Sequence, residues 1–152
     1  KGKSDSRIHF LDNLVKKLDG INYDFYGFKD KEPIWGNDFY KALINSKMGL
    51  NLSRGLPTKY YTSNRIASLM GNGLLTFVDK KTELNDFFNK NEIVYYKDIN
   101  DLANKIKFFK NNNSLRKRIA HNGKKKYFKL FNELKISKYI IEKSLGNSIS
   151  LY

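Results

Sequence analysis

The segment from residue 47 to residue 78 constrains the fold more than any other part of the chain. Apolar residues alternate at Met48, Leu50 and Leu52, which is the period of a β-strand. A second apolar run occupies residues 74–78, and turn formers followed by a short helical pattern lie between the two runs. The segment therefore predicts a strand, a loop, a helix and a second strand, which together form a βαβ unit.

The helix of this unit is predicted from its two ends. Thr62 and Ser63 are good N-cap residues, and residues 66–70 carry apolar side chains at helical spacing. The Gly-Asn-Gly sequence at 71–73 then stops the helix before the second strand. We therefore expect the helix to begin directly after a long polar loop.

Polar and basic residues surround the predicted start of this helix. Ligands of parallel α/β sheets bind beyond the carboxyl ends of the strands, and a helix N-terminus offers backbone N–H groups to a phosphate. Arg54, Asn64 and Arg65 would add side-chain donors there, and Arg65 could make a bidentate contact. The alternative is that Thr62 or Ser63 only caps the helix and that Arg65 lies in solvent.

The rest of the chain repeats the alternation of strands and helices. Strands are predicted at residues 22–26, 48–52, 74–78 and 92–96. The expected N-caps of three other helices are Asp38, then Asp98 or Asn100, and then Ser114. This order favours the α/β class, with a Rossmann-like three-layer parallel sheet, and we expect a single domain over residues 1–152.

Several of these residues carry a resemblance to a known family. The run from Thr62 to Met70, Gly73, the predicted strand at 92–96 and the pair Asp101-Leu102 resemble the carboxy-terminal half of GT-B glycosyltransferases, in particular the CgeB-like group. The pattern of that group is an arginine, a glutamate three residues on and a glycine five after that, then two strands and a helical R-x-x-I-A-x-x-G motif. The resemblance covers roughly residues 37 to 131. The residues that fit it are Arg65, Gly73, Arg116, Ile119, Ala120 and Gly123.

The resemblance implies a glycosyltransferase domain that binds a nucleotide-diphosphate sugar for transfer to an acceptor. Ser68 stands where the family has a glutamate that is expected to hold the donor's ribose, and a serine offers one hydrogen bond where a carboxylate accepts two. The nucleotide is then held differently or weakly, or activity is lost, or Ser68 is an ordinary surface residue. The expected donor-binding residues are Arg54, Gly55, Thr62, Ser63, Asn64, Arg65 and Ser68.

The predicted order of elements and the family also bear on the extent of the domain. An αβ unit that opens with its helix suggests a preceding strand, and enzymes of the resembling family carry an amino-terminal acceptor domain. We therefore expect the 152 residues to be a fragment of a longer enzyme that transfers no sugar by itself. The catalytic residues are unknown.

The composition excludes several classes of function. The chain has no cysteine, so disulfides and thiolate metal sites are excluded. It contains no Walker A loop, no dinucleotide fingerprint and no Asp-x-Asp pair. His9 and His121 lack a second histidine at metal-ligand spacing. We therefore expect no metal and no cofactor.

The net charge of +14 raises a second class of function. It favours anionic partners such as nucleic acid, an anionic membrane surface or phosphorylated ligands. A basic nucleic-acid-binding module is the alternative function, but it needs exposed aromatics between basic residues, and most aromatics here occupy apolar positions. No apolar run reaches the roughly 18 residues of a membrane span and no signal peptide opens the chain, so we expect a cytoplasmic protein, with attachment to the membrane surface as a variant.

Overall fold

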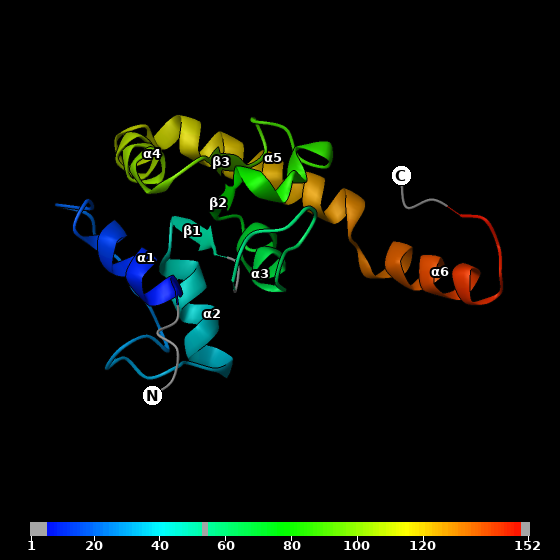
Figure 1. Cartoon of the computed structure of the whole chain (residues 1–152). Helices are drawn as coiled ribbons and strands as arrows, with labels where there is room; N and C mark the ends of the chain where they lie inside the picture. The colour runs from blue at the N-terminus through cyan, green and yellow to red at the C-terminus, as the bar shows by residue number, and fades with distance from the viewer. Residues whose placement is uncertain (1–5, 53–54, 150–152) are drawn as a thin grey trace.

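The structure is a computed structural model, and it describes residues 6–52 and 55–149 (Figure 1). Three short strands lie at its centre and helices surround them, so the predicted α/β class is confirmed. The helices are α1 (Ser6–Val15), α2 (Gly36–Asn45), α3 (Arg65–Gly71), α4 (Ile99–Asn111), α5 (Asn113–Leu130) and α6 (Glu133–Ser144). The strands are β1 (Met48–Asn51), β2 (Leu75–Asp79) and β3 (Val94–Tyr96), and the 3-10 helices η1 (Lys80–Thr82) and η2 (Leu84–Asp86) follow β2.

The sheet is parallel, in the order β1-β2-β3. Leu50 pairs with Phe77 and Phe77 with Val94, so β2 is the central strand. Three of the four predicted strands are confirmed within one or two residues at each end. The segment between β1 and β2 forms the predicted βαβ unit.

The predicted strand at 22–26 is wrong. Residues 21–25 have no regular structure, and the nearest pairing is an isolated antiparallel bridge between Phe28 and Lys31. The rings of Tyr23 and Phe28 contact the ring of Phe25, with centroid distances of 5.2 Å and 5.6 Å. The aromatic residues that suggested a strand therefore form a local cluster in a loop.

The sheet is buried on both faces. Phe77 of β2 lies in a core cluster with residues of α1, α4 and α5, among them Leu14, Leu102 and Ile119. Val78, the next residue of β2, lies in a second cluster with α3 and the segment after β2. Successive side chains of a strand point to opposite faces of the sheet, so the two clusters lie on opposite faces. Together with the sheet, the helices on each face make a three-layer structure.

The helix starts differ from the predicted caps at two of three positions. α2 begins at Gly36, two residues before Asp38, and α5 begins at Asn113, one residue before Ser114, so neither side chain is an N-cap. α4 follows the prediction, because the Asp98 carboxylate accepts hydrogen bonds from the backbone N–H groups of Asn100 and Asp101. Of the two candidate caps of α4, the structure selects Asp98.

Asp98→Ala is expected to lower the free energy of unfolding by about 1 kcal/mol, the usual cost of an N-cap loss. Asn100→Ala is the control, because only the backbone N–H of Asn100 takes part in the cap. Urea denaturation followed by circular dichroism measures both. Equal losses in the two variants would contradict the role of the cap.

α6 contributes no buried residue to the core. It extends away from the sheet (Figure 1). No helix in the part of the chain that the structure describes is long and apolar enough to cross a membrane. The core is therefore complete without α6.

Candidate functional site at the strand ends

The carboxyl ends of the three strands meet at one edge of the sheet. Asn51, Asp79 and Tyr96 are the last residues of β1, β2 and β3, and parallel pairing places Asn51 beside Val78 and Asp79 beside Tyr96. The loop before α3, the segment with η1 and η2, and the start of α4 all leave the sheet at this edge. Ligands of open α/β sheets bind at this edge, so these three segments form the candidate site.

The segment that leads into α3 is bonded to the end of β1. The Ser63 hydroxyl donates to Asn51 Oδ1 at 3.4 Å, and the Thr62 hydroxyl donates to the Ser63 carbonyl oxygen at 2.9 Å. The N-cap of α3 is Asn64, without a side-chain cap bond, so Thr62 and Ser63 are not its caps as predicted. The reason is that α3 begins at Arg65, so its N-cap position falls on Asn64, one residue after Ser63 and two after Thr62.

Arg65 is held at the end of β1. Its Nη1 donates to the Leu52 carbonyl oxygen at 2.8 Å. Burial lowers the pKa of Arg65 from its ordinary value, the nearby cation of Arg7 lowers the pKa further, and Tyr61 raises it. Among the residues that the structure describes, no carboxylate forms an ion pair with Arg65. The Arg65 side chain is exposed, but its hydrogen bond to Leu52 holds it at the end of β1, so it does not extend freely into solvent.

The remaining predicted site residues are spread over this edge. Asn64 is exposed and adjoins Arg65, and Gly55 is exposed with φ +84°, a left-handed conformation that suits glycine. Ser68 is partly buried on α3, where its carbonyl oxygen accepts from Asn72 Nδ2 at 2.8 Å. Arg54 lies outside the described residues. Ser63 and Arg65 therefore lie together, because each is hydrogen-bonded to the end of β1, at Asn51 and Leu52. No such bond holds Gly55 or Ser68 there.

The loop before α3 is also bonded to the segment after β2. The Tyr60 backbone N–H donates to the Thr82 carbonyl oxygen at 2.7 Å, and Lys59 forms an ion pair with Glu83 at 2.9 Å. Thr82 is buried, and its hydroxyl donates to the Asp79 carbonyl oxygen at 2.7 Å. These bonds fix the loop over the ends of β1 and β2.

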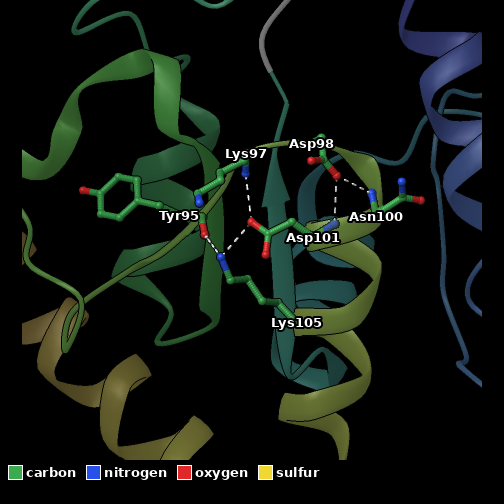
Figure 2. A network of polar contacts seen from close by, with 6 residues as sticks. All are labelled: Tyr95, Lys97, Asp98, Asn100, Asp101 and Lys105. Carbon is green, nitrogen blue, oxygen red and sulfur yellow. Dashed lines mark hydrogen bonds and ion pairs between the residues drawn. The ribbon is translucent and has the colours of Figure 1, made fainter.

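The start of α4 differs because its own acidic residues occupy it (Figure 2). Asp98 accepts the first backbone N–H groups of the helix, and Asp101 accepts from Lys97 N at 2.9 Å and Lys105 Nζ at 2.8 Å. Lys105 also donates to the Tyr95 carbonyl oxygen at 2.7 Å. Two carboxylates and their partners leave no place there for a phosphate, so an anion is favoured on the β1 side of the edge.

A cavity of about 250 Å³ lies beside the candidate site. Its wall is mostly aromatic and aliphatic, so the cavity suits an apolar group rather than a phosphate. Thr62 and Ile66, on either side of the start of α3, connect it to the site. Its lining residues are Tyr60, Thr62, Ile66, Leu84, Phe87, Phe88, Tyr127 and Phe131.

Two residues at this edge were not predicted as site residues. Asn51 is only 2% exposed, and the alternation of apolar residues at Met48, Leu50 and Leu52 gave no reason to single it out. Arg7 interacts electrostatically with Arg65 across 58 positions of sequence (65 − 7). The sequence around Arg7 gives no signal for such a long-range interaction. No group of three or more metal-ligating side chains occurs among the described residues.

Comparison with known proteins identifies the class. Residues 7–133 match the family described as glycosyl transferase-like. This match spans most of the chain and all three strands, so the chain belongs to the glycosyl transferase-like family. Searches among curated proteins and among solved structures gave no significant match.

Proposed function

We propose that the chain is the donor-binding domain of a glycosyltransferase and that it binds a nucleotide-diphosphate sugar at the carboxyl ends of β1 and β2. Membership of the glycosyl transferase-like family and the Rossmann-like sheet support this proposal. The observation that carries it is the position of Arg65, which is anchored to Leu52 at the end of β1 and has no carboxylate partner among the described residues.

The chemistry of Arg65 suits a diphosphate. A guanidinium offers five N–H donors in a planar fork that matches phosphate oxygens, and one of them is already used to fix its orientation. A partly desolvated cation interacts more strongly with an anion than a fully hydrated one, because the effective dielectric constant around it is lower. The remaining donors of Arg65 therefore form a pre-oriented contact for a phosphate.

The finer assignment follows the resemblance to the carboxy-terminal half of GT-B enzymes and to the CgeB-like group. In this assignment the donor's diphosphate lies at Arg65, and its ribose lies near Ser68, one turn further along α3. Ser68 gives the ribose one hydrogen bond in place of the two that a glutamate accepts. The proposal therefore includes a weak hold on the ribose and a binding energy that depends mainly on the phosphates.

Arg65→Ala is expected to weaken the binding of UDP or GDP by about 1.5 to 3 kcal/mol, the range for hydrogen bonds to charged groups. The free energy of unfolding should change little, because the side chain is exposed on one side and donates only to one loop carbonyl. Isothermal titration calorimetry of both proteins with UDP, GDP and a single-stranded oligonucleotide measures the change.

Arg118→Ala is the matched control, because Arg118 is an exposed arginine on α5 and lies outside the candidate site. It should bind nucleotides as the wild type does. Equal nucleotide affinity of Arg65→Ala and the wild type would remove the phosphate role of Arg65. Tight, salt-sensitive binding of the oligonucleotide instead would support the nucleic-acid-binding alternative.

A further inference from the structure

The positive charge of the chain is concentrated in one segment. Residues 102–132 hold ten of the 29 basic residues and none of the 15 acidic residues, so this segment carries +10 of the net charge of +14. It comprises most of α4 and the whole of α5. The net charge is therefore a local property of this segment rather than an even excess of lysine along the chain.

The basic side chains of α5 gather on its solvent face. The exposed ones are Lys117, Arg118, Lys124, Lys125 and Lys129. At about 100° per residue they fall within an arc of about 140°, and the buried residues of α5 lie on the other side of the helix. No ion pair within the described part of the chain involves any of these five residues. They form an uncompensated cationic surface, which we call the basic face of α5.

α6 adds exposed apolar side chains directly after this face. Leu134, Ile141 and the C-cap Leu145 are 77%, 57% and 71% exposed. Their spacing of seven and then four residues places them along one side of the helix, which we call the apolar stripe of α6. Lys135 Nζ donates to the Lys129 carbonyl oxygen at 2.7 Å, so the start of α6 is held against the end of the basic face.

These two surfaces together suit an anionic lipid bilayer. Lysines near a membrane are attracted to anionic headgroups, and an exposed aliphatic stripe on a helix can enter the boundary between headgroups and acyl chains. Single-stranded nucleic acid is bound by basic residues together with aromatic rings that stack on the bases. Phe128, 47% exposed on the basic face, suits either partner, but the leucines and the isoleucine of the apolar stripe cannot stack on bases. The lipid surface is therefore favoured.

We propose that the basic face of α5 and the apolar stripe of α6 dock the chain on an anionic membrane surface. The lysines and Arg118 contact lipid phosphates, and the apolar stripe is buried among the headgroups. This contact is separate from the nucleotide site at the strand ends and does not depend on it. It weakens as the salt concentration rises, because salt screens the attraction between exposed charges.

Cosedimentation with lipid vesicles tests the proposal. The chain should bind vesicles of phosphatidylcholine mixed with phosphatidylglycerol, and it should not bind vesicles of phosphatidylcholine alone. The double variant Lys117→Glu with Lys125→Glu should partition to the mixed vesicles at least about 25-fold more weakly, because each basic residue near an anionic surface contributes about 5-fold. Its circular dichroism should match that of the wild type, since both side chains are exposed.

Lys16→Glu with Lys17→Glu is the matched control. Lys16 and Lys17 are exposed after the end of α1, and their reversal gives the protein the same net charge as the first double variant. This control should keep most of the wild-type binding to the mixed vesicles. Equal losses in the two double variants would show that binding follows the net charge and not the basic face of α5, and would overturn the proposal.

Ile141→Ser tests the apolar stripe, with Ile44→Ser as its control. Ile44 is 77% exposed on α2, and Ile141 is 57% exposed on a helix without buried residues, so both variants should fold as the wild type does. Only Ile141→Ser should bind the mixed vesicles several-fold more weakly. Unchanged binding in Ile141→Ser would contradict the role of α6. Binding of a single-stranded oligonucleotide without binding of the mixed vesicles would overturn the proposal in favour of nucleic acid.

Discussion

Phe77→Ala is expected to lower the free energy of unfolding by about 3 to 5 kcal/mol, the range for truncating a buried phenylalanine. Phe77 is 1% exposed and lies in the middle of β2, the central strand. Its ring contacts Phe109 of α4 at a centroid distance of 6.3 Å. Residues of α1, α4 and α5 pack in the same core cluster as Phe77. The cavity left by the Phe77 ring therefore cannot close unless one of these helices moves.

Phe108→Ala is the control for this prediction. Phe108 is the same residue type on α4, but it is 49% exposed, and its truncation should cost about 1 kcal/mol or less. Guanidinium denaturation followed by circular dichroism measures both variants. Similar losses for the two residues would show that β2 is not the centre of the core.

The strands at the centre of the fold could be predicted from the sequence because each is a short apolar run between turn formers. The run at 74–78 became β2 (Leu75–Asp79), and Gly73, with φ +77°, ends the preceding helical segment as predicted. The segment at 22–26 contains aromatic residues that favour strands, with Asn22 and Asp24 among them, but it forms no strand. Aromatic residues favour a strand only where a neighbouring strand is available to pair with it, and that neighbour is decided by the rest of the fold.

The site could be predicted only in part, for a related reason. Arg65 was predicted as a site residue because it adjoins the predicted start of a helix, and in the structure its side chain donates to Leu52 at the end of β1, while its role in binding stays a prediction. The roles of Thr62 and Ser63 as caps were wrong, since α3 begins at Arg65 and its N-cap position falls on Asn64. The cation of Arg7, which lowers the pKa of Arg65, comes from another segment, and single-sequence patterns carry no information on such long-range interactions.

The R-x-x-I-A-x-x-G motif of α5 acquires a physical explanation from the structure. Arg116, Ile119, Ala120 and Gly123 are the buried residues of this helix. Arg116 donates from Nη1 to the Lys47 carbonyl oxygen at 3.2 Å, just before β1, and Ile119 and Ala120 lie in the core cluster of the sheet. The motif therefore marks the face of α5 that contacts the sheet, and Gly123 is its closest approach.

Gly123→Ala is expected to lower the free energy of unfolding by about 3 kcal/mol, the upper part of the usual range for overpacking. A Cβ atom at this position would overlap the backbone oxygen of Glu92, just before β3, and would lie 3.1 Å from Met70 Cε of α3. Helix propensity alone predicts the opposite sign, because alanine favours a helix interior over glycine by about 1 kcal/mol. The clash decides, since a backbone oxygen cannot move without moving β3.

Gly71→Ala separates these two effects. Gly71 ends α3, and a Cβ there would meet only Phe128 Cζ at 3.8 Å, an ordinary contact, so this variant should be neutral or slightly more stable.

Gly123→Ala should also weaken UDP binding in the molecules that remain folded, because Met70 belongs to the helix that begins with Arg65. Urea denaturation and UDP titration of both variants measure this. A Gly123→Ala protein as stable as Gly71→Ala would mean that α5 does not approach the sheet as closely as the structure shows, and the position of α3 at the site would then need another cause.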